Sequence, residues 1–165
     1  MRHLWGANSA GVLWLALFAL ITDQACKLYL LNVFDISANG PVDLLPFMEL
    51  VMVWNRGISY GLFQQHAETG RIALTVLSFL AALALWIWSA RMDQKFPAVC
   101  LGLLIGGALG NGIDRAAYGA VADFFHFHIG SFSWYVFNIA DVWIVAGVAG
   151  LLYDSFFNSP NTAAK

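Results

Sequence analysis

Four long apolar runs alternate with shorter, more polar segments along the chain. They cover residues 12–31, 72–90, 97–113 and 134–153, so each is 17 to 20 residues long. A helix of roughly 20 apolar residues crosses about 30 Å of hydrocarbon. The pattern therefore predicts an all-α membrane protein with four transmembrane helices.

The two segments 32–71 and 114–133 lie between the first and second runs and between the third and fourth, so both lie on the same side of the membrane. Within the first, "NGPVDLLP" is rich in turn residues, "FMELVMVW" is typical of a short extended segment, and "NRGISYGLF" contains two glycines. We expect this segment to form a small extracytoplasmic β cradle. Trp54, Tyr60 and Phe63 would then lie at headgroup level.

Composition supports the membrane assignment, since 60% of the residues are hydrophobic and only 11% are charged. Soluble domains carry about a quarter charged residues. Little sequence remains for a separate soluble domain, so residues 1–165 are expected to form a single integral membrane domain. The net charge of −2 argues against a nucleic-acid partner. Cys26 and Cys100 lie within predicted helices and suggest packing, not a disulfide framework.

Positive charges outside the runs predict the orientation of the chain. Two lysines and two arginines lie on the side of both termini, and two arginines lie on the other side: Arg2, Arg91, Lys95 and Lys165 against Arg56 and Arg71. The excess favours cytoplasmic termini. The apolar run that follows Arg2 resembles a signal peptide, but it contains Asp23 and resumes after Lys27. We therefore expect an uncleaved first helix.

The third run contains Gly102, Gly106 and Gly110, spaced four residues apart. On a helix they form one smooth stripe, which allows a neighbouring helix to approach closely. We interpret this stripe as a packing surface.

Unsatisfied polar groups within a bilayer cost several kcal/mol, so each polar side chain in a run needs a partner or a purpose. Asp23 and Lys27 are four residues apart, acid before base, and predict a structural ion pair. Asn111, Asp114 and Arg115 are spaced to share a helix face. Arg115 would neutralise Asp114 or hold the carbonyls of another chain. Scaffolding and substrate binding both remain open for this group.

Asp123 and Asp141 have no cation close in sequence. Asp141 is the eighth residue of its predicted helix, about 10 Å along the axis from the outer end, and Asp123 lies in the loop that leads back to it. Two carboxyls in a poorly hydrated site share one proton, which is the working state of an aspartic protease. From spacing alone, catalysis, ion or proton translocation and structural hydrogen bonding all remain open.

His126 and His128 alternate and would face one way on an extended segment, towards a metal if His66 or an aspartate supplied a third ligand. The sequence contains no H-E-x-x-H pattern, and histidines at a membrane interface commonly bind no metal. We expect no metal and no other cofactor. No G-x-S-x-G pattern is present either.

Five sequence elements together resemble the lipoprotein signal peptidase (signal peptidase II) family. "DQACK" is similar to the family's first-helix D-x-x-x-K element, "NRGISYGLF" to its N-x-G-x-[AS]-[FWY]-[GS] element, and "GGALGNGIDR" to its G-G-x-x-G-N-x-x-D-R element. "VADFF" and "FNIAD" resemble the two elements that contain its catalytic aspartates. The five elements occur in order and span most of the chain.

This resemblance implies an aspartic endopeptidase of the bacterial inner membrane, with its active site near the outer face. The substrate would be a diacylglyceryl-modified prolipoprotein, cut before its lipidated lipobox cysteine. By resemblance, Asp123 and Asp141 are the catalytic pair. The positions that match residues lining or supporting the family's site are Asn55, Gly57, Asn111, Arg115 and Asn138, and those that match structural polar residues are Asp23, Lys27 and Asp114.

Three positions depart from the commonest family pattern: Cys26 stands where Ser or Thr is frequent, Ser59 where Ala is frequent, and Ala122 where Val is frequent. All are small residues, so they affect packing and remove no ionisable group. The expected partners are the substrate and membrane lipid, and we expect a monomer. A small membrane transporter or proton-conducting protein that uses buried carboxylates is the alternative function.

Overall fold

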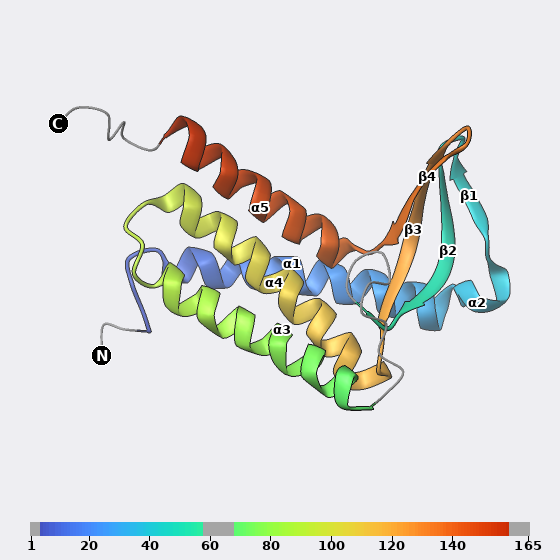
Figure 1. The fold of residues 1–165 in the computed structure, drawn as a ribbon, viewed down its shortest axis with the longest axis horizontal. Coiled ribbons are helices and arrows are strands. Elements are labelled where there is room, and N and C mark those ends of the chain that lie inside the picture. The colour runs from blue at the N-terminus through green and yellow to red at the C-terminus, as the bar shows by residue number, and fades with distance from the viewer. Residues whose placement is uncertain (1–3, 58–67, 159–165) are drawn as a thin grey trace.

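The computed structural model describes residues 4–57 and 68–158. Figure 1 shows long helices packed side by side, with a small sheet at one end of the bundle. The helices are α1 (Ser9–Leu28), which continues as a π-helical turn over Tyr29–Val33, α2 (Ile36–Asn39), α3 (Glu68–Ser89), α4 (Lys95–Tyr118) and α5 (Ile139–Phe157). The strands are β1 (Val42–Leu45), β2 (Met48–Asn55), β3 (Val121–Ile129) and β4 (Phe132–Phe137).

Four helices among the described residues are long and apolar enough to cross a membrane, which confirms the four predicted spans. Their bounds differ from the sequence prediction. The third span runs to Tyr118 instead of ending at residue 113, so Asp114 and Arg115 belong to the helix and not to an outer segment. Gly119 ends α4 with a φ of 77°, a left-handed conformation that favours glycine.

The fourth span begins five residues later than predicted. Residues 134–137 form part of β4, and the helix begins at Ile139. "FSWYVF" is aromatic and β-branched and pairs with β3, which a hydrophobic run alone cannot distinguish from a helix. Asp141 is consequently the third residue of α5, not the eighth, and lies in its first turn.

The sheet is antiparallel, with the strand order β1-β2-β3-β4. The extended segment predicted around "FMELVMVW" is confirmed as β2, but the first outer segment does not build the cradle alone. β3 and β4 come from the second outer segment and its continuation, so Asp123 lies on a strand instead of in a loop. Trp54 is partly exposed, whereas Tyr60 and Phe63 lie outside the described residues.

α4 is the central helix, and α1, α3 and α5 each pack against it. The predicted glycine stripe is confirmed as a packing surface, because Gly102 and Gly106 face the backbone of α1. A Cβ atom on Gly106 would lie only 2.5 Å from the carbonyl oxygen of Ala16. The beginning of α1 and the end of α5 lie at the end of the bundle opposite the sheet (Figure 1).

Candidate active site

Asp123 lies on β3 and accepts a hydrogen bond from a side chain of the neighbouring strand β2. The register of β2 with β3 pairs Asn55 with Val121, at the end of β2 nearest the bundle. From there Asn55 Nδ2 donates to Asp123 Oδ2 at 3.1 Å, while Asn55 Oδ1 accepts from the Gly57 N–H at 3.0 Å. The second bond fixes the orientation of the Asn55 amide, so that its NH₂ group faces the carboxyl. The Asp123 side chain is 1% exposed.

Asp141 is placed by the start of its helix. Asn138 is the N-cap of α5, and its Oδ1 accepts from the Asp141 N–H at 3.0 Å. In return, Asp141 Oδ2 accepts from the Asn138 N–H at 3.3 Å. This reciprocal capping box satisfies two backbone donors and holds the carboxylate where the helix dipole favours negative charge.

Asn138 also joins the two acids. Its side-chain Nδ2 donates to Asp123 Oδ1 at 2.6 Å and to Asn111 Oδ1 at 3.1 Å. Asn111 in turn donates from Nδ2 to Asp141 Oδ1 at 2.9 Å. Asp123 and Asp141 therefore belong to one hydrogen-bonded network, although they come from a strand and a helix.

The pKa of Asp123 is raised from its ordinary value of 3.8 to about 7. Burial is the largest cause, and the negative charge of Asp141 raises it further. Hydrogen bonds from Asn138 and Asn55 act in the opposite direction. Near neutral pH, this pKa favours a state in which the two carboxyls hold a single proton.

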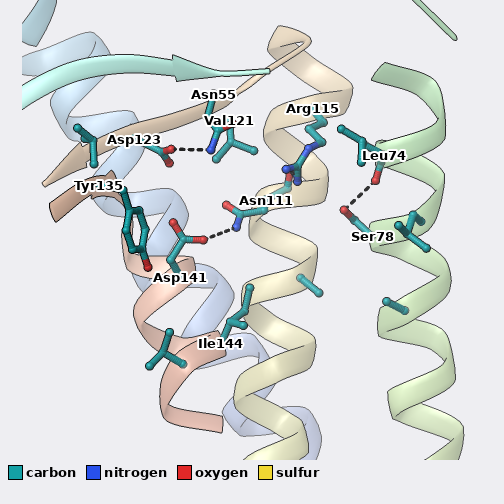
Figure 2. Close-up of a pocket in the computed structure, with 15 residues that line it drawn as sticks. Asn55, Leu74, Ser78, Asn111, Arg115, Val121, Asp123, Tyr135, Asp141 and Ile144 are labelled. Carbon is teal, nitrogen blue, oxygen red and sulfur yellow. Dashed lines mark hydrogen bonds between the residues drawn. The ribbon is translucent and has the colours of Figure 1, made fainter. Parts of the chain in front are cut away.

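Both acids line a cavity of about 350 Å³ whose walls come from α3, α4, α5 and the sheet. Figure 2 shows the carboxyls of Asp123 and Asp141 directed into the space between the helices, with Asn111 beside Asp141. Away from the acids the lining is mainly apolar. The apolar residues of the lining are Leu74, Leu77, Ala81, Ala108, Val121, Val136, Ile144 and Val145.

Tyr135 and Ser78 also line this cavity and were missed by sequence reasoning. Tyr135 was assigned to a helix, and its place on β4 is what turns it towards the site. Ser78 lies in an apolar run without a recognisable motif, and its hydroxyl donates to the Leu74 carbonyl on its own helix. Neither residue carried a signal that the sequence alone would reveal.

Arg115 does not pair with Asp114. Its Nη2 donates to the Gly57 carbonyl at 3.0 Å and its Nη1 to the Asn111 carbonyl at 3.3 Å, so it holds backbone carbonyls of its own chain. Asp114 instead pairs with Lys27, at 2.8 Å. Adjacent helical residues point about 100° apart. Only Asn111 and Arg115 of this group line the cavity.

The predicted pair of Asp23 and Lys27 is confirmed, with 2.8 Å between Oδ2 and Nζ. Sequence reasoning missed Gln24, whose Nε2 donates to Asp23 Oδ2 and Asp114 Oδ1, both at 3.1 Å. No spacing rule predicts a glutamine that bridges two acids on different helices.

His126 and His128 lie on β3, the strand that also carries Asp123, and neither lines the cavity. His126 Nδ1 is 2.6 Å from Glu49 Oε1, and its Nε2 is 2.7 Å from Ser133 Oγ. His66 lies outside the described residues. Residues 4–57 and 68–158 contain no group of three His, Cys, Asp or Glu side chains arranged to hold a metal.

The family model and two similar relatives point to the same protein family. The model of the signal peptidase (SPase) II family matches residues 15–157. A lipoprotein signal peptidase of Methylobacterium sp. (strain 4-46) is 57% identical over 139 residues, covering 84% of both chains. One from Nitrobacter hamburgensis is 54% identical over 154 residues, covering 91% of this chain and 93% of the relative.

Solved structures agree on the fold. A bacterial membrane enzyme solved by the in meso method at 2.3 Å resolution is 26% identical and superposes with a TM-score of 0.77. That match covers 100% of this chain and 99% of the other. A second bacterial membrane enzyme, solved at 1.9 Å, is 24% identical, with a TM-score of 0.75 over 97% of this chain and 99% of that one, and supports the fold alone.

Proposed function

Because the chain belongs to the signal peptidase II family, we propose that Asp123 and Asp141 are the catalytic pair with which it removes signal peptides from lipoproteins. The substrate is a diacylglyceryl-modified prolipoprotein, and cleavage occurs before the lipidated lipobox cysteine. The family supports a protease that processes lipoproteins. The assignment of residues and of the scissile bond is our proposal.

The observation that carries the proposal is the pair of carboxyls that line one cavity and belong to one hydrogen-bonded network. With a pKa of about 7, Asp123 is the partner that holds the proton near neutral pH. Asp141 accepts from the Asn111 side chain and the Asn138 N–H at a helix N-terminus, so it is the carboxylate. The different surroundings thus give the two acids different roles.

In this mechanism Asp141 takes a proton from a water molecule as that water attacks the scissile carbonyl. Asp123 donates its proton to the carbonyl oxygen, which becomes a hydroxyl of the tetrahedral intermediate. When the C–N bond breaks, Asp141 returns its proton to the leaving nitrogen. The hydroxyl of the intermediate then gives its proton back to Asp123, which restores the resting state.

The apolar part of the cavity suits a lipid-anchored substrate. α3 and α5 pack mainly against α4, and the cavity lies between them with Ala108 and Asn111 of α4 in its lining. Apolar side chains such as Leu77 and Val145 line it, and Figure 2 shows Ile144 on the side of Asp141 away from the sheet. Acyl chains of the substrate would remain at this depth while the peptide reaches the acids near the sheet.

We further propose the bacterial inner membrane as the location, with both termini cytoplasmic and the sheet at the outer face. The greater number of positive charges on the side of the termini supports this orientation. We also propose that the chain acts as a single integral membrane domain and a monomer, without a nucleic-acid partner. The aspartate pair and water suffice for the reaction, so we propose that it requires no cofactor.

The test is cleavage of a diacylglyceryl-modified prolipoprotein by the purified protein, which is measured as a mobility shift on a gel. We expect Asp123→Asn and Asp141→Asn each to reduce the rate by at least about 10⁴-fold, since each removes one of the two acid-base groups. Asp43→Asn, on the exposed β1 strand, is the matched control and should retain full activity.

A substrate that lacks the lipid modification should not be cut. Near-normal cleavage by either active-site variant would refute the assignment of the pair. Proton flux into liposomes that depends on the same two acids, without cleavage, would instead support the transport alternative.

A further inference from the structure

Two aspartates on different helices bind the backbone just before each acid of the catalytic pair. Asp23 Oδ1, on α1, accepts from the N–H of Ala140 at 2.9 Å. Asp114 Oδ2, on α4, accepts from the N–H of Ala122 at 3.1 Å. Ala140 precedes Asp141, and Ala122 precedes Asp123. The same type of contact therefore holds a helix and a strand at equivalent points.

Lys27 joins these two aspartates into one unit. Its Nζ lies 2.8 Å from Asp23 Oδ2 and 2.8 Å from Asp114 Oδ2, and Gln24 bridges the same two carboxylates. We refer to Asp23, Gln24, Lys27 and Asp114 as the Lys27 cluster. The side chains of the lysine and the two aspartates are 3%, 0% and 1% exposed.

The cluster also reaches one acid of the pair through a side chain. Lys27 Nζ donates to Asn111 Oδ1 at 3.3 Å, and Asn138 Nδ2 donates to the same oxygen. With its oxygen engaged by these donors, the amide of Asn111 presents its NH₂ group to Asp141. The Lys27 ammonium and the Asn138 amide thereby together set which end of the Asn111 amide faces the carboxylate.

Stability is a poor explanation for such a cluster. Burying an ion pair costs desolvation energy that the attraction between the charges often fails to exceed, and apolar replacements are frequently as stable. Catalytic groups, by contrast, need supporting contacts that hold them within about 0.5 Å of the productive geometry. The contacts of this cluster end on the residues next to both acids, where such support has most effect.

We propose that the Lys27 cluster is a positioning unit, which sets the relative placement of Asp123 and Asp141 and thereby determines the rate of the chemical step. This inference rests on the proposed function, in which those two residues carry out the cleavage. Gln24 belongs to the unit because it donates to both cluster aspartates.

The experiment compares kcat and KM for variants of Asp23, each normalised to the folded fraction measured by circular dichroism and size-exclusion chromatography. Asp23→Leu removes the acceptor for the Ala140 N–H, and we expect kcat to fall about 100-fold because a displacement of about 1 Å has that effect. KM should change by less than about threefold. Asp23→Asn retains an oxygen acceptor and should recover at least about tenfold of the lost kcat.

Thr22→Val is the matched control. Thr22 Oγ1 accepts from Trp143 Nε1 at 3.0 Å, so it is another polar link between α1 and α5, but it does not contact the backbone next to either acid. We expect its kcat to remain within about twofold of the original protein, even if its melting temperature falls. An equal loss of kcat in Thr22→Val and Asp23→Leu would show that general helix attachment is responsible, and would overturn the proposal.

Gln24→Met provides the decisive result if Asp23→Leu does not fold. It removes the bonds to both cluster aspartates while retaining the length of the side chain, and kcat should fall about tenfold with KM unchanged. Unchanged kcat in Gln24→Met, and in Asp23→Leu where that variant folds, refutes the positioning role if Asp123→Asn is inactive in parallel. Activity in Asp123→Asn would refute the proposed function instead.

Discussion

At the scale of single residues, Asn138 combines a structural and a chemical contact in one side chain. Its Oδ1 caps α5, and its Nδ2 donates to Asp123. Asparagine is among the preferred N-cap residues, so the cap alone would explain its presence. The donated bond to Asp123 links the start of α5, which carries Asp141, to β3.

Substitutions at Asn138 separate these two contacts. Asn138→Ser retains a cap acceptor and loses the amide donor, so we expect stability within about 0.5 kcal/mol of the original and cleavage reduced about tenfold or more. Asn138→Ala loses both contacts and should cost about 1 kcal/mol of additional stability. Thermal unfolding in detergent and the cleavage assay measure the two effects. Full activity in Asn138→Ser would contradict a role for the amide donor.

The raised pKa of Asp123 gives cleavage a predictable pH dependence. Below its pKa of about 7 Asp123 holds a proton, and above that pH it is ionised. The rate should therefore fall as the pH rises through about 7, because no proton remains to polarise the scissile carbonyl. A kcat profile between about pH 5.5 and 8.5 measures this limb. A rate that rises steadily through pH 8 would contradict the assignment of Asp123 as the acid.

The same shift affects stability. The folded-state pKa of about 7 lies above the ordinary value of 3.8, so the folded protein retains a proton that the unfolded chain has released between these values. Protonation of Asp123 therefore adds to the stability of the folded state, and this added stability is complete below about pH 3.8 and is lost as the pH rises through about 7. We expect Asp123→Asn to lose this part of the pH dependence of the melting temperature. An unchanged pH dependence in that variant would count against the shift.

At the scale of elements, α4 organises the bundle because its glycines let other helices approach. Gly106 faces α1, and Gly107 faces the Ala140 carbonyl of α5. Close approach on this side brings Asp114 and Asn111 of α4 within reach of Lys27 on α1. The glycine surface thus determines the separation at which the polar contacts form.

Gly106→Val tests this packing. A Cβ at Gly106 would lie 2.5 Å from the Ala16 carbonyl oxygen and 2.6 Å from the Ala19 Cβ, so α1 must move away. We expect a loss of at least about 3 kcal/mol or failure to fold, measured as yield and melting temperature in detergent. Gly11→Ala is the control, because nothing lies within 4 Å of its added Cβ. A normal melting temperature in Gly106→Val would contradict the close contact.

At the scale of the whole molecule, the cavity between α3 and α5 joins the candidate active site to helices that are long and apolar enough to cross a membrane. Both acids line it, and Figure 2 shows the apolar Ile144 beyond Asp141, on the side away from the sheet. This arrangement fits the proposed substrate, whose peptide and acyl chains would lie at different depths. The sheet lies at one end of the bundle (Figure 1), and Asp123 belongs to its strand β3 while Asp141 lies in the first turn of α5.

Ala81→Trp should narrow this cavity. Ala81 lines it from α3, so an indole there would occupy space below the acids. We expect KM for the lipid-modified substrate to rise about tenfold or more, because the indole would exclude the acyl chains from part of the cavity. Leu80→Trp is the control, since Leu80 is 56% exposed and does not line the cavity. Equal KM values for both variants would contradict the placement of the acyl chains in this cavity.

Much of the fold followed from the apolar runs, because the cost of exposing backbone polar groups to hydrocarbon leaves few options for a run of about 20 apolar residues. The pair of Asp23 and Lys27 followed from helical spacing in the same way. The prediction that residues 134–137 belong to the fourth helix was wrong. An aromatic, β-branched segment next to a helix extends the apolar run without belonging to the helix.

By itself, the sequence determined the number of spans, the packing surface of the third helix and, through resemblance, the candidate catalytic pair. Only the tertiary structure decided which groups surround that pair. The bonds from Asn55 to Asp123, from Asn111 to Asp141 and from Asp23 to the Ala140 N–H join segments separated by 30 to 117 positions. Local spacing specifies neighbours along one helix or strand, whereas contacts between distant segments depend on strand register, the start of α5 and the distance between packed helices.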